Sequence, residues 1–320
     1  MSINQSINQS INQSINQSIN QSINQSINQS ILQENVNITT IYAYEYTKEM
    51  FADCALTIHS ALCKLGFNAQ ITSNVIYSDP NYTNIILVPH LLYEGDLIRL
   101  NKNSIIVNAE QLPSWQFSEN HQFFFFKILY LAAKCQVWDY NSKNIELFNK
   151  LGLNHVQYLQ FGYVPELKRI DNNVEKTIDV LFYGAINERR RNILEKLKEH
   201  GLNVVSLAGV YGKELDQYIA QSKLVINIHH YEAEIFEIIR CFYLMNNGVA
   251  IVSEINPTTT IDQKELLEGI VGVPYDKLVD TCIELIQNPK KLEDLRKKAL
   301  SVIKQYPQEI LIQSLVKKAE

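Results

Sequence analysis

The sequence predicts an α/β protein of two doubly wound domains that face a cleft, preceded by a disordered repeat. Three observations lead to this prediction. A low-complexity segment fills the N-terminus, short apolar runs alternate with helical patterns over the rest of the chain, and a polar segment separates this alternation into two halves. Short apolar runs without strict alternation are typical of parallel strands that helices cover on both faces.

The N-terminal segment is a tetrapeptide repeat. Residues 2–29 are seven perfect copies of Ser-Ile-Asn-Gln, and residues 30–33 are a decayed eighth copy. This composition buries too little surface to offset the entropy lost on ordering, so we expect residues 1–35 to be disordered. A four-base unit read in triplets returns a tetrapeptide, and slippage of such a tract would shift the reading frame. We interpret the repeat as the mark of a phase-variable gene; a repeat without regulatory role is the alternative.

The remaining chain divides into two Rossmann-like domains. Strands of the first domain, residues 36–164, are expected at 38–44, 84–89, 104–108, 136–139 and 156–161. Its helices are expected at 48–65, 122–133 and 141–151. Residues 165–176 are polar and are expected to form a linker.

The second domain, residues 177–320, repeats the alternation. Its strands are expected at 177–183, 203–207, 224–228, 249–253 and 270–273. Its helices are expected at 188–200, 213–222, 235–245, 275–287 and 289–305, with a short helix near 263–267 and a further segment at 308–318. Ligands of doubly wound domains bind outside the carboxyl ends of the strands, so the loops after these strands are the candidate site.

Composition narrows the class of protein. The 320 residues carry a formal net charge of −5, so no broad basic surface is expected and nucleic acid is not an expected partner. The five cysteines are widely spaced without a C-x-x-C pair, which argues against a zinc site or a disulfide framework. The N-terminus has no signal-peptide pattern, and a cytoplasmic location is expected.

The most apolar window is an aromatic run that begins at Phe123. It is interrupted by Lys127 and is too short to span a bilayer. One interpretation is peripheral contact with the inner face of the cytoplasmic membrane, which would carry a lipid-linked acceptor. The helical spacing with Ile128, Leu129 and Leu131 favours packing in the core instead.

The loop after the first strand of the second domain is rich in arginine. Gly184 lets the backbone approach a ligand, and a helix begins beyond Asn187. Cations are disfavoured at a helix N-terminus, so Arg189 and Arg190 suggest a bound anion, and we expect them to hold a diphosphate. A solvated basic face is the alternative.

Two further loops carry candidate residues. Gly209, Tyr211 and Gly212 form a glycine loop between a strand and a helix, a pattern that is weak alone. The third loop follows the strand ending at Ile228. It supplies two histidines and an aromatic residue, then acidic residues, and its helix places Glu237 and Arg240 on one face.

Taken together, these segments resemble the donor-binding half of GT-B glycosyltransferases, especially a group of bacterial glycosyltransferase-like proteins. The resemblance covers residues 179–254 and rests on Tyr183, Gly184, Asn187, Arg189, Arg190, His229, Tyr231, Glu232, Glu237, Arg240, Val252, Ser253 and Glu254. Residues 108–111 and 138–141 of the first domain fit more loosely. The repeat resembles those heading genes of lipooligosaccharide biosynthesis.

The resemblance implies a nucleotide-sugar donor in the second domain and a glycan or lipid-linked glycan acceptor. It implies that Glu237 binds ribose hydroxyls, that His229 binds phosphate or sugar oxygens, and that Arg240 orients Glu237. The donor-binding residues would be Gly184, Asn187, Arg189, Arg190, Gly209, Tyr211, Gly212, His229, Tyr231, Glu232, Glu237 and Arg240. No cofactor and no metal are expected, since arginines and helix dipoles supply positive charge and no Asp-x-Asp occurs.

The catalytic residues are less defined. Many retaining GT-B enzymes place two glutamates eight residues apart near this helix, and the pair is absent here. Retention or inversion therefore stays open, and the candidate bases at strand ends of the first domain are Glu45, His90 and Glu110. A nucleotide-sugar epimerase of the same shape and a non-catalytic nucleotide- or glycan-binding relative are the alternatives to a glycosyltransferase.

Overall fold

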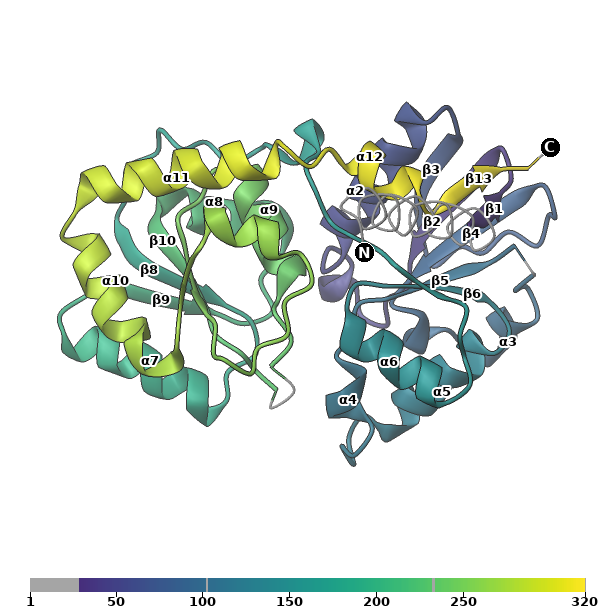
Figure 1. Ribbon diagram of the computed structural model, residues 1–320, viewed down its shortest axis with the longest axis horizontal. Coiled ribbons are helices and arrows are strands. Elements are labelled where there is room, and N and C mark those ends of the chain that lie inside the picture. Colours follow the sequence, from purple (N-terminus) through teal and green to yellow (C-terminus); the bar gives the residue numbers. More distant parts are fainter. Residues whose placement is uncertain (1–28, 102, 232–233, 320) are drawn as a thin grey trace, which may run out of the picture.

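The computed structural model describes residues 29–101, 103–231 and 234–319, which form two α/β domains side by side (Figure 1). The repeat up to residue 28 and Glu232 lie outside the described residues. In the described part of the chain, no helix is long and apolar enough to cross a membrane.

The first domain is built on a parallel sheet with the strand order β3-β2-β4-β5-β6-β7. Its strands are β2 (Asn35–Thr40), β3 (Asn68–Ser73), β4 (Tyr82–Leu87), β5 (Ile105–Asn108), β6 (Gln136–Asp139) and β7 (Val156–Tyr158). Its helices are α2 (Ala52–Lys64), α3 (Glu94–Leu97), α4 (Leu112–Trp115), α5 (Gln122–Ala132) and α6 (Ser142–Lys150). Buried side chains of α4, α5 and α6 pack on one face of the sheet, and those of α2 pack on the other.

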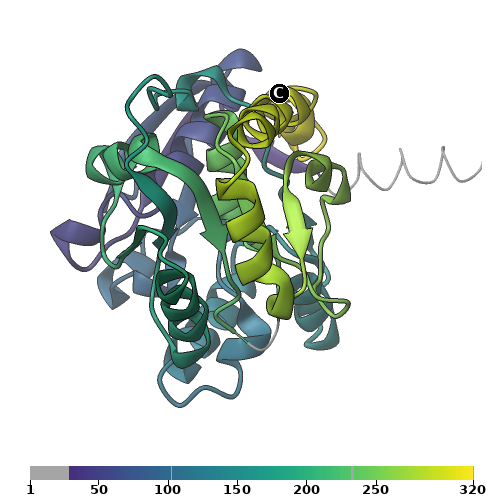
Figure 2. The ribbon, with the colours of Figure 1, turned by 90° about the vertical axis from the view of Figure 1, so that its left-hand side faces the viewer.

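The second domain repeats this plan with the strand order β12-β11-β10-β8-β9. Its strands are β8 (Ile178–Tyr183), β9 (Val204–Leu207), β10 (Ser222–Asn227), β11 (Ile251–Glu254) and β12 (Val271–Val273). Its helices are α7 (Glu188–Glu199), α8 (Gly212–Gln221), α9 (Ile238–Asn246), α10 (Leu278–Ile286) and α11 (Pro289–Ile303). Helices α7 and α10 cover one face of the sheet, and α8, α9 and α11 cover the other (Figure 2).

Both sheets reverse their strand order at an equivalent place. β2 lies between β3 and β4, and β8 lies between β9 and β10, all in parallel pairing. Crevices open at such switch points because the two neighbouring connections leave for opposite faces of the sheet. The two-domain doubly wound architecture expected from the sequence is confirmed.

Both ends of the described chain fold onto the first domain. β1 (Ser30–Leu32) pairs in parallel with β13 (Val316–Lys318), and α12 (Gln308–Gln313) packs on α2 (Figure 1). The prediction that disorder extends to residue 35 is wrong for residues 30–32, which form β1, and for Asn35, which begins β2. Leu32 stands where the repeat has asparagine, and this apolar side chain is fully buried. The last helix and strand likewise belong to the first domain and not to the second.

Other departures from the sequence prediction are local. β3 was not expected, because its edge position leaves Ile71 exposed and its pattern polar. The segment expected as a linker is partly packed, since Leu167 and Ile170 are buried between the domains. Along α5, Ile128 and Leu131 are in the core as expected, whereas Phe123 and Phe126 are exposed.

Candidate functional site

A pocket of about 480 Å³ lies between the domains, beyond the carboxyl ends of strands from both sheets. Its first-domain wall comes from residues 49–53, 109–111 and Tyr140. Its second-domain wall comes from the loop after β8, the loop after β9 and the first turns of α9. Gly184, Gly209, Tyr211, Gly212, Tyr231, Glu237 and Arg240 line it, as does Glu110.

Gly184 and Arg240 form the centre of the second-domain wall. Gly184 has φ +132°, and the Nη2 atom of Arg240 lies 2.9 Å from the point that a β-carbon there would occupy. The Nη1 atom of Arg240 donates to Asn227, while its buried Nε has no hydrogen-bond partner among the described residues. A buried N–H without an acceptor is rare. The guanidinium of Arg240 also lines the pocket and brings positive charge to its wall.

Glu237 lies at the start of α9 as its N-cap residue. Its Oε2 accepts from the side-chain amide of Asn227 at 2.9 Å and from Nδ1 of His229 at 3.0 Å. Burial alone would raise the pKa of Glu237, but His229, Arg240 and Asn227 outweigh it and lower the pKa to about 2. Glu237 is therefore a fixed anion at the pocket wall and can accept hydrogen bonds from hydroxyl groups.

The glycine loop after β9 borders the start of α8. Gly209 and Gly212 have φ of +71° and +58°, and a β-carbon at Gly212 would overlap the carboxylate of Glu49 in the first domain. Glycine is thus required here both by the backbone and by the close approach of the other domain. With Val210, the loop offers an open surface to a flat ligand.

Arg189 is not brought to the pocket. Its guanidinium forms a two-pronged ion pair with Glu254, which is fully buried, and stacks on Tyr275 with 3.9 Å to the ring centroid. It borders a separate surface hollow. The charge of Arg189 at the start of α7 is therefore balanced by an internal carboxylate.

Arg190 and Asn187 hold the loop after β8 in place from the side away from the pocket. Arg190 is buried and donates to the carbonyl oxygens of Ile228 and Ala185, while Asn187 caps α7 through the N–H of Arg190 at 3.0 Å. Neither lines the pocket, contrary to the expected donor contact. His229 is also behind the wall, because both of its ring nitrogens are occupied by Glu237 and Thr259.

Of the three candidate bases, only Glu110 lines the pocket. It follows β5 and is partly buried, and burial raises the pKa of Glu110 to about 7. Glu45 is exposed and paired with Lys48 at 3.2 Å. His90 lies edge-on to Trp115 and Phe124, and burial lowers the pKa of His90 to about 4.

A buried polar hub holds the Glu110 loop. Asp139 accepts from Asn108 at 2.6 Å and from Asn144 at 2.9 Å, and both amides also donate to the carbonyl oxygen of Glu110. The next residue, Gln111, reaches across the cleft and donates to the carbonyl oxygen of Ile235 at 3.2 Å. These bonds fix the main chain of Glu110 at the pocket.

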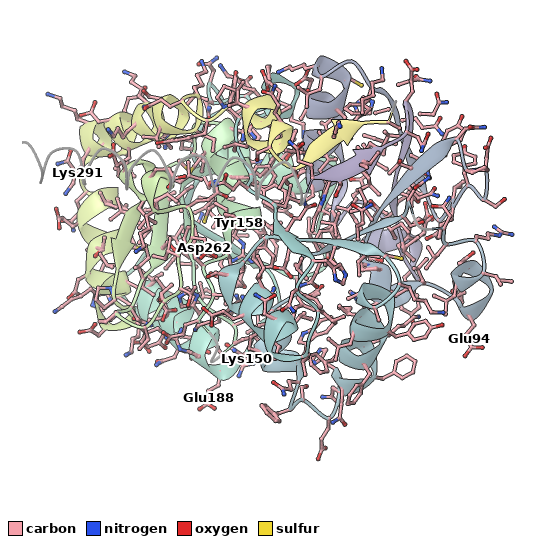
Figure 3. The ribbon with its side chains drawn as sticks, turned by 45° about the vertical axis from the view of Figure 1, so that its right-hand side comes forward. Glu94, Lys150, Tyr158, Glu188, Asp262 and Lys291 are labelled. Carbon is pink, nitrogen blue, oxygen red and sulfur yellow. The ribbon has the colours of Figure 1, made fainter. Side chains whose placement is uncertain are left out.

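Two sets of contacts between the domains were not expected from the sequence. Arg169, in the segment between the domains, pairs with Asp53 of α2 and Asp216 of α8, each at 2.7 Å, and stacks on Tyr243. Asp262 of the second domain caps α6 of the first through Asn141 and Ser142; it lies beside Tyr158 at the junction (Figure 3). Contacts between residues so far apart in the chain leave no local sequence signal.

The described residues contain no cluster of three or more His, Cys, Asp or Glu side chains that could hold a metal ion. Positive charge at the pocket is supplied by Arg240.

Solved structures share this architecture. The chain matches T4 phage BGT in complex with UDP-glucose at a TM-score of 0.53, with 10% identity, over 88% of this chain and 99% of that one. It matches Anabaena HepE in complex with UDP and glucose at 0.55, with 11% identity, over 86% and 97% of the two chains. TarM matches at 0.51 with 12% identity over 74% and 54%. The fold is GT-B.

Sequence relatives add no function. No family model matches the chain. Among curated relatives, the uncharacterized protein L140 of Acanthamoeba polyphaga mimivirus is 30% identical over 197 residues, which are 60% of this chain and 62% of that protein. The uncharacterized protein L137 of the same virus is 27% identical over 229 residues, 69% and 30% of the two. The chain thus spans less than two thirds of these relatives.

Proposed function

We propose that the protein is a glycosyltransferase that moves a sugar, a hexose in the simplest case, from a nucleotide-sugar donor to a glycan acceptor. The observation that carries the proposal is the assembly of Gly184, Arg240 and Glu237 at the switch point of the second domain, facing Glu110 across the pocket. The second-domain wall carries the guanidinium of Arg240 and the ionised carboxylate of Glu237. The first-domain wall carries the carboxyl group of Glu110, which can take up a proton.

The donor nucleotide lies on the second-domain wall. The diphosphate sits against the Gly184 loop, and the guanidinium of Arg240 donates to a phosphate oxygen. Glu237 accepts hydrogen bonds from ribose hydroxyls, and the base lies on residues 208–212. T4 phage BGT was solved with UDP-glucose and HepE with UDP and glucose, which makes UDP-sugars the first donors to test.

Glu110 is the general base of an inverting reaction. Its carboxylate takes the proton of an acceptor hydroxyl while that oxygen bonds to the anomeric carbon. The bond from this carbon to the diphosphate oxygen breaks, and the negative charge that develops on the leaving group is stabilised by Arg240. A pKa of about 7 suits a base at neutral pH. No metal is needed in this scheme; since T4 phage BGT was also solved with UDP and Mn²⁺, assays are to be run with and without Mn²⁺.

The acceptor is a surface glycan carried on a lipid, as in lipooligosaccharide, and the protein works in the cytoplasm at the membrane face. The exposed side of α5 supports peripheral contact, since Phe123 is 72% and Phe126 58% exposed. Lys134 follows on the same side, and residues 120–135 contain no acid. The repeat supports phase-variable expression, which is typical of genes that alter a cell surface.

The test is donor turnover with and without acceptor, followed by NMR. A glycosyltransferase consumes the donor in proportion to acceptor and releases the nucleoside diphosphate with a new glycosidic bond. An epimerase of the same shape changes the sugar without acceptor. A protein that binds nucleotide but turns over nothing in either condition would contradict the proposal and favour a non-catalytic binding role.

A further inference from the structure

His229 is buried directly behind the pocket wall. Its side chain does not line the pocket, and the residue is 1% exposed. Its Nδ1 lies 3.0 and 3.2 Å from the two carboxylate oxygens of Glu237, and its Nε2 lies 3.0 Å from Oγ1 of Thr259. The imidazole thus links a residue that faces the pocket to the loop after β11.

The partner at Nε2 lets this link persist in both charge states of the imidazole. Oγ1 of Thr259 already accepts from the N–H of Asn256 at 2.9 Å. Its own hydrogen can still be donated to Nε2 of a neutral histidine, and its second lone pair can accept from a protonated one. In either state, Nδ1 carries a hydrogen and donates it to Glu237.

The charged groups around His229 favour a protonated His229 beside an ionised Glu237. Glu237 and Glu234 face it from the segment leading into α9, and Glu254 from β11 accepts from its backbone N–H at 3.0 Å. Arg190 and Arg240 lie on the other side of Glu237, and Arg189 neutralises Glu254. Burial alone would lower the pKa of His229, but these carboxylates outweigh it and raise the pKa.

We propose that His229 is a positioning residue of the donor site, which fixes the Glu237 carboxylate toward the pocket so that it accepts the ribose hydroxyls of the donor. This inference rests on the proposed function. It replaces the direct phosphate or sugar contact expected of His229 from the sequence. A histidine that only fills space in the core would leave the charge and orientation of Glu237 unchanged when it is replaced by an apolar residue.

The first test compares donor affinity across pH in His229→Leu and His229→Asn. Asparagine places an amide N–H near the position of Nδ1, whereas leucine has no donor. We expect His229→Leu to bind the donor 10- to 100-fold more weakly at pH 7 and to weaken further toward pH 5. His229→Asn should stay within about fivefold of wild type. The matched control is His200→Leu, at the exposed end of α7, which should change neither affinity nor its pH dependence.

A second readout needs no donor. The ¹³C shift of the Glu237 carboxyl, assigned with Glu237→Gln, reports its ionisation in the free protein. It should stay ionised in wild type to low pH and titrate at a higher pH in His229→Leu and, to a smaller extent, in Thr259→Val. Thr259→Val also serves if the leucine variant does not fold.

The outcomes separate the two proposals. An unchanged Glu237 titration and an unchanged pH profile of affinity in folded variants would overturn the role of His229. A shifted titration in a protein that binds no nucleotide-sugar would confirm the coupling of His229 to Glu237 and overturn the donor site.

Discussion

The guanidinium of Arg240 occupies the space that a side chain on Gly184 would need, with Nη2 2.9 Å from the position of a β-carbon there. The contact joins the loop after β8 to α9. Position 184 therefore requires glycine for two reasons. Its backbone has φ +132°, and the Arg240 guanidinium leaves no room for a side chain. Glycine at this position therefore lets the Arg240 guanidinium lie against the loop at the pocket wall.

Gly184→Ala should weaken nucleotide binding by at least about tenfold, because a methyl group displaces Arg240 from the loop. Isothermal titration calorimetry measures this. The matched control is Gly201→Ala, at φ +81° with open space around it. It should cost about 1 kcal/mol of stability from backbone strain and leave binding unchanged. Equal losses of affinity in both variants would show that strain, and not the contact with Arg240, governs the site.

Replacing Arg240 should mainly weaken donor binding, whereas replacing Arg189 should mainly lower the stability of the fold. Arg240→Met should lower donor affinity about 30-fold, the cost of one charge-assisted hydrogen bond of about 2 kcal/mol. It should lower the melting temperature less than Arg189→Met does, although Asn227 loses a donor. Arg189→Met leaves Glu254 buried without its partner and should cost about 3 kcal/mol of stability, with affinity nearly unchanged. Calorimetry and thermal unfolding distinguish them; the reversed pattern would restore Arg189 as the diphosphate ligand.

The pH dependence of turnover should report Glu110. Its pKa is raised by burial to about 7, and a base acts when deprotonated, so kcat/KM should rise with pH through about 7 and then level off. Glu110→Gln should lower kcat by about 10² to 10⁴ and abolish this limb. Glu45→Gln is the control carboxylate. Asp139 also has a pKa raised by burial to about 7, so a limb that disappears in Asp139→Asn but persists in Glu110→Gln would contradict the assignment.

The exposed side of α5 should bind lipid. Replacing Phe123 and Phe126 by serine removes two aromatic rings that lie in solvent, so folding should hold while co-sedimentation with vesicles containing anionic phosphatidylglycerol falls at least about fivefold. Ile310→Ser, on α12 and 62% exposed, is the control. No sedimentation of wild type with such vesicles would remove peripheral contact from the account.

Two N-terminal deletions should show that the fold needs β1 but does not need the repeat before it. Deleting residues 2–28 keeps β1 and should leave the melting temperature unchanged. Deleting residues 2–33 removes fully buried Leu32 and the hydroxyl of Ser30 that accepts from Trp138 at 3.1 Å, and should cost about 3 kcal/mol. Equal stability of the two proteins, compared by thermal unfolding, would contradict the role of β1.

The features that could be predicted from the sequence are those encoded by local patterns of residues. Apolar runs and helical spacing predict most strands and helices. Neighbouring residues also predict that the Gly184, Glu237 and Arg240 segments belong to one site, and in the structure all three line one pocket. What it missed depends on distant partners. Arg189 looked like an anion ligand because Glu254, 65 residues away, was not known to neutralise it. Leu32 looked like part of the repeat because β13 comes from the other end of the chain.

The donor nucleotide is expected to bind at Gly184, Arg240 and Glu237. The most direct test titrates wild type and Arg240→Met with UDP-, GDP-, CMP- and dTDP-sugars by calorimetry, with and without Mn²⁺. One nucleotide class should bind wild type, and its affinity should fall about 30-fold in the variant. Binding that Arg240→Met leaves unchanged, or no binding of any of these donors, would contradict this expectation.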